Sequence, residues 1–360
     1  MAQAIAAAAS VRCLTSPNPW VGAVVVEAGA TQGVSGATQP PGGAHAEIVA
    51  LSRCSNPRGA TLFTTLEPCS HRGRTGPCAD ALIDAGVARV VIAIVDPDPL
   101  VAGRGIEKLR QAGIEVVVGV GADAVSEQLA PYLHHRRTGR PWVVLKMAAT
   151  LDGMTAAADG TSQWISGPSA RADVHRLRAE SNAILVGAGT VAGDNPSLTV
   201  RDWAPELLRA PTTGAGASPD GDGPVDAADL PGSVVADVDL NPRRIVLGHA
   251  GPEARVHPCL EWDGSVPDLL DHLGQDQVVQ LMVEGGATVA ASFRELDLVD
   301  EYVIYLAPAL AGGSEGRPLF TGAGPASITD LWRGRFADVA TVGDDIRVRL
   351  LRADAPTVHP

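Results

Sequence analysis

Cysteines, aromatic residues and long apolar runs are all scarce in this sequence. Its 360 residues include five cysteines, and aromatic residues make up 4% of the chain. No apolar run reaches the ~18 residues that a membrane-spanning helix needs. The alanine-rich start, Met1–Ser10, lacks the basic stretch of a signal peptide. An odd number of cysteines in such a chain indicates a reducing compartment, where cysteines serve as metal ligands or core residues. We therefore predict a cytoplasmic protein with no membrane partner.

Basic residues are also in deficit. The chain has 28 Lys and Arg against 41 Asp and Glu, which gives a formal net charge of −13. Proteins that bind nucleic acids carry a basic face to neutralise phosphates, so we expect no nucleic-acid partner. A small phosphorylated substrate is compatible with this balance, because one or two well-placed arginines are enough to hold it.

The length allows two hydrophobic cores, since a single core stops growing at roughly 250–300 residues. The polar stretch His134–Pro141 predicts a break between a domain at 1–138 and a second domain at 141–360. Strand and helix patterns alternate on both sides of it, which is typical of the α/β class. Strands are predicted at 21–26, 60–65, 89–95, 114–118, 142–147, 183–187, 244–248, 278–284 and 301–307, helices at 46–54, 78–85, 105–112, 168–181 and 287–296, and a hairpin at 337–351.

One stretch of the second domain has a different composition. Ala210–Ser233 contains no aromatic or basic residue and is dominated by Gly, Pro, Ala, Thr and Asp. Such a stretch buries too little apolar area to offset the entropy of ordering it. We predict a mobile surface insertion at about 205–240.

Four residues of the first domain form the sharpest chemical pattern. His45 and Glu47 stand in HAE, Cys69 ends EPC, and Cys78 follows, each set opening a predicted helix. One His and two Cys leave the fourth position of a tetrahedral Zn²⁺ for water, and the carboxylate moves protons, as in zinc deaminases. Alternatively, the cysteines are core thiols and His45 is a satisfied polar residue. That alternative is weakened because all four occur in order.

The spacing of the two cysteines departs from the general P-C-x-x-C motif. Eight residues separate Cys69 from Cys78, and Arg72 stands where the short motif has its second cysteine. The spacing therefore concerns the kind of zinc deaminase, and not whether the chain is one.

The sequence resembles the bifunctional deaminase/reductase family of riboflavin biosynthesis, which has the longer loop between the cysteines. The resemblance covers nearly the whole chain, apart from 210–233 and, more weakly, 241–274. It implies a cytidine-deaminase-like three-layer domain, followed by a dihydrofolate-reductase-like α/β domain that uses NADPH. The motifs that carry it are TSPNPWVGAVVV (Thr15–Val26), HAEIVAL (His45–Leu51), TLEPCSHRGRTGPC (Thr65–Cys78), DPDPLVAGRGIEKLRQAGIEV (Asp96–Val116), LKMAATLDG (Leu145–Gly153), SQWIS (Ser162–Ser166), LVGAGTVAGDNPSLTVR (Leu185–Arg201) and VEGGATVA (Val283–Ala290).

For the first domain, the resemblance implies zinc ligands His45, Cys69 and Cys78, the acid/base Glu47, and substrate contacts at Asn18 and Arg74. The implied substrate is a diaminopyrimidinone ribosylamine 5′-phosphate, deaminated at ring carbon 2. Asn18 is equally readable as a turn residue and Arg74 as a surface charge. Many members have a His seven residues before the zinc His, where this chain has Thr38, so no role is carried over to Thr38.

For the second domain, the resemblance implies hydride transfer to C1′ of the opened ribose. The chain has no G-x-G-x-x-G after a strand, so a Rossmann site has no support. Gly-Gly before a helix start would let a pyrophosphate approach the backbone, although a turn without a ligand is the common alternative. By resemblance, the cofactor contacts are Ala148, Trp164, Thr190, Asp194 and Gly286, and the substrate contacts are Ser162, Arg178, Leu198, Arg201 and Glu284. Lys146 is a candidate for orienting the opened sugar, or else a member of a structural ion pair.

Three functions are compared on this basis. The leading hypothesis is a bifunctional enzyme with Zn²⁺ and NADPH, and the second is a deaminase whose distal domain is structural. The third is a nucleic-acid base-modifying protein, which the acidic balance disfavours. Formation of a homo-oligomer is left open by the sequence.

Overall fold

The structure, a computed structural model, describes residues 1–70, 76–99, 101–201, 203–205, 239–322 and 324–353. These residues form two compact units, one over Met1–Thr138 and one over Gly139–Trp203 and the described part of Leu240–Pro356. None of the helices within these ranges combines the length and the hydropathy of a membrane span. The predicted insertion at about 205–240 lies almost entirely outside the described residues.

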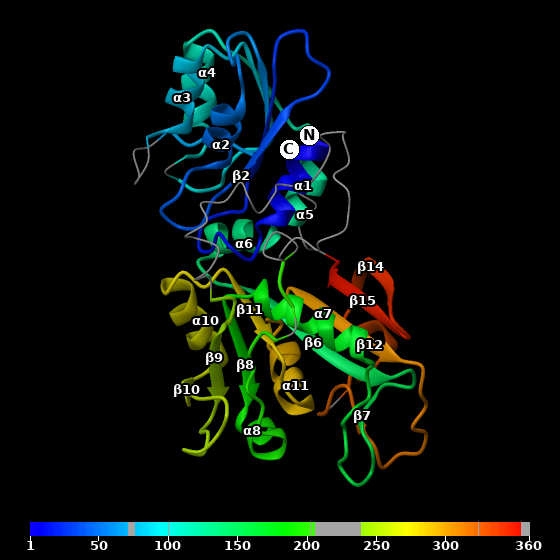
Figure 1. The fold of residues 1–360 in the computed structure, drawn as a ribbon. Helices are drawn as coiled ribbons and strands as arrows, with labels where there is room; N and C mark the ends of the chain where they lie inside the picture. The colour runs from blue at the N-terminus through cyan, green and yellow to red at the C-terminus, as the bar shows by residue number, and fades with distance from the viewer. Residues whose placement is uncertain (71–75, 100, 202, 206–238, 323, 354–360) are drawn as a thin grey trace, which may run out of the picture. The chain divides into compact units, whose positions relative to one another are not determined.

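The first unit is built on a five-stranded sheet with the order β2-β1-β3-β4-β5 (Figure 1). β1 pairs antiparallel with β2 and β3, whereas β3, β4 and β5 run parallel. The strands are β1 (Gly22–Val26), β2 (Val34–Ala37), β3 (Thr61–Leu66), β4 (Arg89–Ile94) and β5 (Glu115–Val118).

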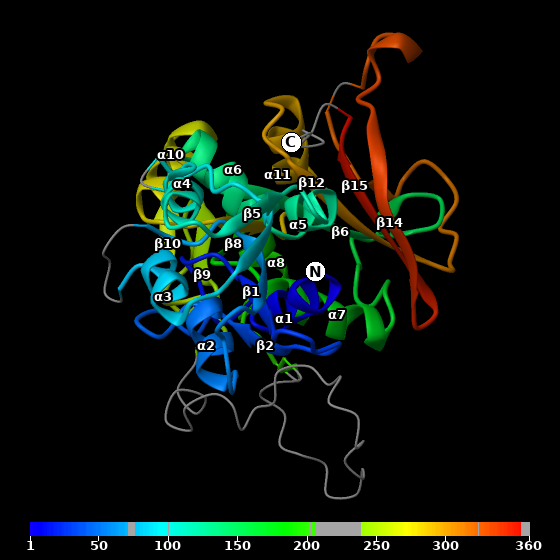
Figure 2. The same ribbon diagram turned by 90° about the horizontal axis from the view of Figure 1, so that it is seen from above.

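Helices cover both faces of this sheet and give the three layers that the resemblance implied (Figure 2). They are α1 (Ala2–Ser10), α2 (Ala46–Arg53), α3 (Cys78–Ala85), α4 (Arg104–Gln111), α5 (Ala122–Gln128) and α6 (Ala130–Thr138). Two glycines allow the close approach. A Cβ on Gly22 would lie 1.9 Å from the carbonyl oxygen of Ala4 in α1, and one on Gly36 would lie 2.4 Å from the amide of Ala50 in α2. Since Gly36 pairs with Ala23, next to Gly22, α1 and α2 lie on opposite faces.

The second unit is built on an eight-stranded sheet with the order β10-β9-β8-β11-β6-β12-β15-β14. The strands from β10 to β12 run parallel, and β15 and β14 continue the sheet antiparallel. The strands are β6 (Trp142–Thr150), β8 (Ala183–Gly187), β9 (Arg243–Leu247), β10 (Leu260–Trp262), β11 (Gln280–Val283), β12 (Glu301–Ala307), β14 (Gly334–Val342) and β15 (Asp345–Arg352), and a separate ribbon pairs β7 (Met154–Ala156) with β13 (Arg317–Pro318).

Helices again lie on both faces. α10 (Val266–Gln275) and α11 (Ala287–Glu295) contribute Leu269, Leu273 and Phe293 to a core with the odd-numbered side chains of β6. α7 (Pro168–Ala179) packs on the other face, while the short α8 (Ala188–Asp194) follows β8 and the 3₁₀ turn η3 (Ile328–Asp330) precedes β14.

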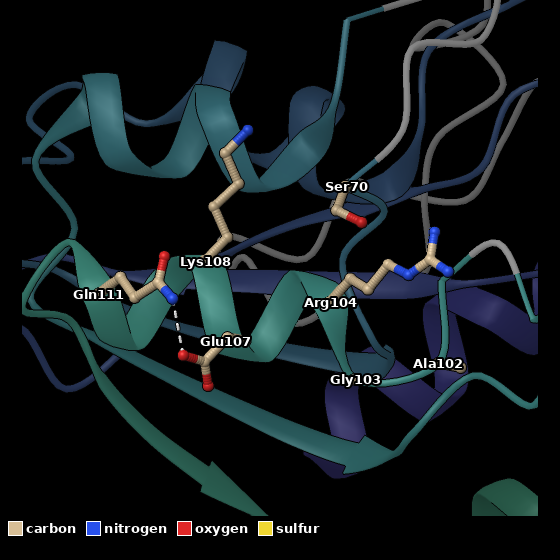
Figure 3. Close-up of a pocket in the computed structure, with 7 residues that line it drawn as sticks. All are labelled: Ser70, Ala102, Gly103, Arg104, Glu107, Lys108 and Gln111. Carbon is tan, nitrogen blue, oxygen red and sulfur yellow. Dashed lines mark hydrogen bonds between the residues drawn. The ribbon is translucent and has the colours of Figure 1, made fainter.

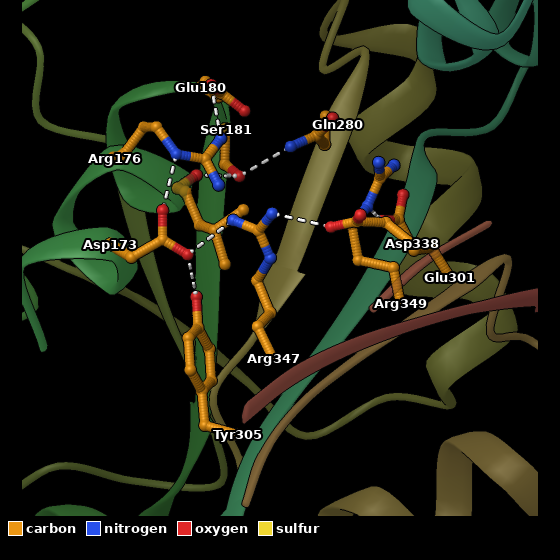
Figure 4. Close-up of polar contacts among 11 residues, drawn as sticks. Asp173, Arg176, Glu180, Ser181, Gln280, Glu301, Tyr305, Asp338, Arg347 and Arg349 are labelled. Carbon is orange, nitrogen blue, oxygen red and sulfur yellow. Dashed lines mark hydrogen bonds and ion pairs between the residues drawn. The ribbon is translucent and has the colours of Figure 1, made fainter. Parts of the chain in front are cut away.

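Polar contacts anchor α7 to the antiparallel end of the sheet (Figure 4). Asp173 of α7 accepts hydrogen bonds from the Tyr305 hydroxyl of β12 (2.7 Å) and from the Arg347 guanidinium of β15 (2.9 Å). Arg176, one turn along the same helix, also binds Asp173 at 2.7 Å. These contacts fix the orientation of the helix that carries Arg178.

The α/β class is confirmed, and the predicted strands and helices are found with ends shifted by a few residues. The two units divide between Thr138 and Gly139, within the stretch His134–Pro141, and α6 continues through Thr138. Tyr132 and Leu133 are buried in this helix, so tertiary packing outweighs the polar composition of its last turn. α10 was not predicted, although Ser265 caps it by accepting a hydrogen bond from the Asp268 amide at 3.2 Å.

Candidate functional sites

The three predicted metal ligands meet at the ends of neighbouring elements. His45 is the N-cap residue of α2, Cys69 lies just after β3, and Cys78 is the first residue of α3. The His45 Nδ1 atom lies 3.5 Å from Cys69 Sγ and 3.2 Å from Cys78 Sγ. One nitrogen and two sulfurs therefore face a common point.

These distances fit a zinc ion. With Zn–N and Zn–S bonds of ~2.0–2.1 and ~2.3 Å, tetrahedral ligands would be roughly 3.6 Å apart. All three ligand atoms lie within 4.8 Å of one another. A hydrogen bond from Cys78 lowers the pKa of Cys69 to about 4, whereas the pKa of Cys78 is raised by that same contact and by burial. The two sulfurs thus hold one proton between them, which a divalent cation displaces.

Glu47 lies beside the ligands without being one of them. It stands in the first turn of α2 and is only 4% exposed. Burial and the negative charge of Cys69 raise the pKa of this carboxyl to about 7, against the lowering effect of His45. A group with a pKa near 7 both accepts and returns protons at neutral pH, as an acid/base catalyst must.

Glu67 is a residue whose role was not predicted. Its buried carboxylate accepts four backbone N–H groups: Oε1 binds the amides of Gly105 (2.9 Å) and Ile106 (3.2 Å), and Oε2 those of Gly103 (2.9 Å) and Asp96 (3.3 Å). Three of these amides belong to the start of α4 or directly precede it, where N–H groups lack partners within the helix. Glu67 thereby fastens the chain two residues before Cys69 to α4.

A cavity of about 610 Å³ lies beside this connection and is lined by Ser70, Ala102, Gly103, Arg104, Glu107, Lys108 and Gln111 (Figure 3). Its side chains come mainly from α4. Lys108 forms an ion pair with Asp80, and Glu107 accepts a hydrogen bond from Gln111 at 2.7 Å. Neither Glu47 nor a metal ligand lines it, so this cavity is distinct from the metal centre.

The remaining residues considered in the first domain make local contacts or lie outside the described residues. Asn18 closes a turn, with its amide donating to the Thr15 carbonyl at 2.9 Å. Thr38 is buried and its hydroxyl accepts a hydrogen bond from the Val21 amide at 3.1 Å, so it joins the two strands of the sheet edge. Arg74 lies outside the described residues.

In the second unit the structure brings together Lys146, Arg178 and Glu284. Arg178 of α7 binds Glu284 through two parallel contacts of 2.6 and 3.0 Å, and Lys146 of β6 lies 3.9 Å from the same carboxylate. Burial alone would raise the pKa of Glu284, but Arg178 and Lys146 lower it to about 2. Burial lowers the pKa of Lys146. The ionised triad carries one net positive charge, which suits an anionic ligand.

Arg201 lies next to this group through a residue that the sequence did not single out. The backbone amide of Arg201 donates to His175 Nδ1 at 3.2 Å, and its guanidinium binds the Ser197 hydroxyl at 2.6 Å. Burial and the charges of Arg178 and Arg201 lower the pKa of His175. A neutral His175 therefore lies beside the basic side chains.

Two of the predicted cofactor residues, Thr190 and Gly286, lie near each other where parallel strands end. Glu284 directly follows β11, and Gly286 is the N-cap residue of α11. A Cβ on Gly286 would lie 3.4 Å from the Thr190 hydroxyl of α8, so these two residues are neighbours. β8 and β11 pair in parallel, and the helix that follows each begins at this edge. In open α/β sheets ligands bind at the carboxyl ends of strands, and free N–H groups at helix starts suit a pyrophosphate.

The remaining predicted residues differ in exposure. Trp164 is 70% exposed, with the Arg171 guanidinium 4.7 Å from its ring centroid, whereas Leu198 is buried with a φ of +53°. Asp194 ends α8 and is exposed, while Ala148 and Ser162 are half-buried. Ala148 lies two residues after Lys146 on β6, and therefore on the same face.

Comparison with known proteins agrees with this arrangement. Residues 1–94 match the cytidine and deoxycytidylate deaminase zinc-binding region, and residues 141–348 match the RibD C-terminal domain. Riboflavin biosynthesis protein RibD of Escherichia coli K12 is 40% identical over 98% of each chain.

Solved structures of RibD proteins are similar to this chain over nearly its whole length. Acinetobacter baumannii RibD, form 1, matches with a TM-score of 0.82 and 34% identity over 97% of each chain. The diaminohydroxyphosphoribosylaminopyrimidine deaminase/5-amino-6-(5-phosphoribosylamino)uracil reductase of Thermotoga maritima matches with a TM-score of 0.78 and 33% identity, over 98% of this chain and 97% of that one.

Proposed function

Because the chain belongs to the RibD family of riboflavin-biosynthesis proteins, we propose that it catalyses two successive steps of that pathway. The first is deamination of 2,5-diamino-6-ribosylamino-4(3H)-pyrimidinone 5′-phosphate, and the second is reduction of the ribosyl group to a ribityl chain. The enzyme uses Zn²⁺ and NADPH. The observation that carries the proposal is that one chain holds both a His-Cys-Cys centre with a buried Glu and a separate Lys-Arg-Glu group at the strand ends.

We assign deamination to residues 1–138, with His45, Cys69 and Cys78 as the zinc ligands. When bound, Zn²⁺ supplies a water of lowered pKa for attack on the ring. Glu47 would carry one proton of the attacking water to the ring nitrogen and the other to the departing amino group, which then leaves as ammonia. Its place in the first turn of α2, buried beside the three ligands, suits this double task. Asn18 and Arg74 are proposed to hold the substrate.

We assign reduction to residues 141–360. When bound, NADPH supplies the hydride, and the protein supplies position and charge. Arg178 and Arg201 are proposed to hold the phosphorylated substrate with Ser162, Leu198 and Glu284, while Lys146 orients the opened sugar. The contacts proposed for the cofactor are Ala148, Trp164, Thr190, Asp194 and Gly286. The buried pair of Arg178 and Glu284 supports this assignment, because it keeps a guanidinium fixed beside the strand ends.

A direct assay tests both assignments. Purified full-length chain with zinc, the synthetic pyrimidine phosphate and NADPH should release ammonia and consume NADPH in sequence. Ammonia release without NADPH consumption would favour the alternative of a deaminase with a structural second domain. We further propose a cytoplasmic location, and light scattering during purification would show whether the chain forms a homo-oligomer.

A further inference from the structure

A second group of potential metal ligands lies in the reductase unit and shares no residue with the groups described above. A nitrogen of His257, the Sγ of Cys259 and a carboxylate oxygen of Glu261 all lie within 4.8 Å of one another. Glu261 belongs to β10, at the edge of the eight-stranded sheet. The group falls within 241–274, where the resemblance to the family is weakest, and the proposed function does not use it.

The local chain explains why these side chains meet. Glu261 lies in β10 and Cys259 directly precedes the strand, so the side chains of these alternate positions share a face. His257 lies before the strand, and its ring reaches Cys259. The backbone before the strand is held in place because Arg244 of the neighbouring β9 donates to the His257 carbonyl at 3.2 Å.

The imidazole of His257 is oriented as a metal ligand requires. Its Nε2 lies 3.0 Å from the carbonyl oxygen of Gly251, and since a carbonyl only accepts, Nε2 carries the proton. The lone pair is therefore on Nδ1, which lies 3.5 Å from Cys259 Sγ. The same N–S distance, 3.5 Å, separates His45 from Cys69 in the deaminase centre. A hydrogen bond from the distal nitrogen to a backbone carbonyl is the usual support of a metal-bound histidine.

Glu261 is also held by its surroundings. One carboxylate oxygen accepts the Ala250 amide at 2.9 Å, and the other lies 3.0 Å from His249 Nδ1. His249 Nε2 in turn lies 3.1 Å from Asp263. Each oxygen of the Glu261 carboxylate keeps a second lone pair for a cation, while both ring nitrogens of His249 face carboxylates.

We propose that His257, Cys259 and Glu261 form a second metal site, which binds a divalent cation of zinc-like preference with water as the fourth ligand. Imidazole and thiolate favour Zn²⁺ over Mg²⁺ and Ca²⁺, which prefer oxygen ligands. Binding releases the thiol proton of Cys259 to solvent and forms a metal–sulfur bond, with no change of redox state. Because the ligands lie near the surface, this zinc exchanges faster than the one at His45.

Metal counting on the full-length chain tests the site. The protein is stripped with a chelator, equilibrated with zinc at a buffered micromolar concentration, and analysed for zinc per chain. The unmodified chain should hold about two zinc ions, one at each three-ligand group, and Cys259→Ser about one. Cys54→Ser is the matched control: this free thiol faces the Glu27 carboxylate at 3.4 Å, and its loss should leave the count unchanged.

Cobalt absorption gives a second test, which does not depend on zinc that is bound non-specifically. Cobalt(II) added to Cys69→Ser/Cys78→Ser should still give the near-ultraviolet absorption of a cobalt–thiolate bond, and adding His257→Gln should abolish it. Equal zinc counts in the unmodified chain and Cys259→Ser would overturn the proposal. Should the cysteine double variant fail to fold, the zinc count of Cys259→Ser decides alone, and deamination by that variant should stay unchanged.

Discussion

The metal centre and the strand-end group of the reductase unit are built in opposite ways. The metal centre uses three residues from a stretch of 34, namely His45, Cys69 and Cys78. Each lies at the start of a helix or just after a strand, and the two sulfurs present a shared negative charge to a cation. In the second group, Lys146 and Glu284 are 138 residues apart in the sequence, and together with Arg178 they carry a net positive charge. The first site is defined by ligand type and spacing, the second by charge pairs that exist only in the folded sheet.

The difference also predicts how each site fails. Removing a ligand or the acid/base at the metal centre should abolish chemistry with little effect on the fold around it. Removing the carboxylate from the second group leaves two buried cations uncompensated, so activity and stability should fall together.

The largest effect should come from Glu47→Gln. An amide cannot move protons, so deamination should fall by about 10²- to 10⁴-fold. Zinc content should remain at the level of the unmodified chain because Glu47 is not a ligand, and NADPH-dependent reduction of the deaminated intermediate should persist. Ammonia release and elemental analysis measure the two outcomes.

Cys78→Ser is the comparison for that variant, because it should lose zinc and deamination together. Near-normal turnover by Glu47→Gln would show that another group moves the protons.

The second-largest effect should be the loss of stability in Glu284→Gln. The Arg178 and Lys146 side chains would keep their charges in a site where the carboxylate is 11% exposed. Breaking such a buried pair costs about 3–5 kcal/mol of unfolding free energy, measurable by denaturant titration. Reduction should fall as well, and deamination should remain.

An exposed ion pair between β9 and the end of α10 gives the control. Arg243 binds Asp276 at 2.6 Å, with side chains 40% and 43% exposed. Asp276→Asn should cost no more than about 1 kcal/mol. Equal destabilisation by both changes would mean that the group at Glu284 is solvated and not a buried triad.

Arg201→Ala should have a smaller and more selective effect. Loss of a charge-assisted contact to the substrate phosphate is worth about 1.5–3 kcal/mol, which raises the KM for the deaminated intermediate by roughly 10- to 150-fold. The KM for NADPH and the rate of deamination should change little. An equal rise in the KM for NADPH and for the deaminated intermediate would assign the Arg201 guanidinium a structural role through its contact with Ser197.

The same contrast explains how far the sequence could be interpreted. His45, Glu47, Cys69 and Cys78 were predictable because metal chemistry needs those residue types at element starts. His175 was not, because its partners Arg178 and Arg201 meet it only through the fold. The α/β class followed from alternating patterns, whereas the helical end of α6 did not, because burial of Tyr132 and Leu133 decides it.

Glu67 could be predicted from the sequence only in part. It belongs to the EPC motif, but the amides that it binds come from residues 96–106, and no local pattern in the sequence marks a carboxylate as a helix cap so far away. Its effect should be the smallest of the four, because Gln keeps one acceptor oxygen and loses the other.

In Glu67→Gln, the new amide group would face two backbone N–H donors that no longer have an acceptor, at a cost of about 1–3 kcal/mol. The segment leading to Cys69 should then be held less firmly, so we expect zinc affinity to fall by up to about 10-fold in a chelator competition. Glu107→Gln is the control, since Glu107 is an exposed residue of the same helix whose carboxylate accepts a hydrogen bond from the Gln111 side chain. A destabilised variant with unchanged zinc affinity would make Glu67 a purely structural cap. Weaker zinc binding with Glu107→Gln unaffected would instead show that α4 positions the metal ligand through this one carboxylate.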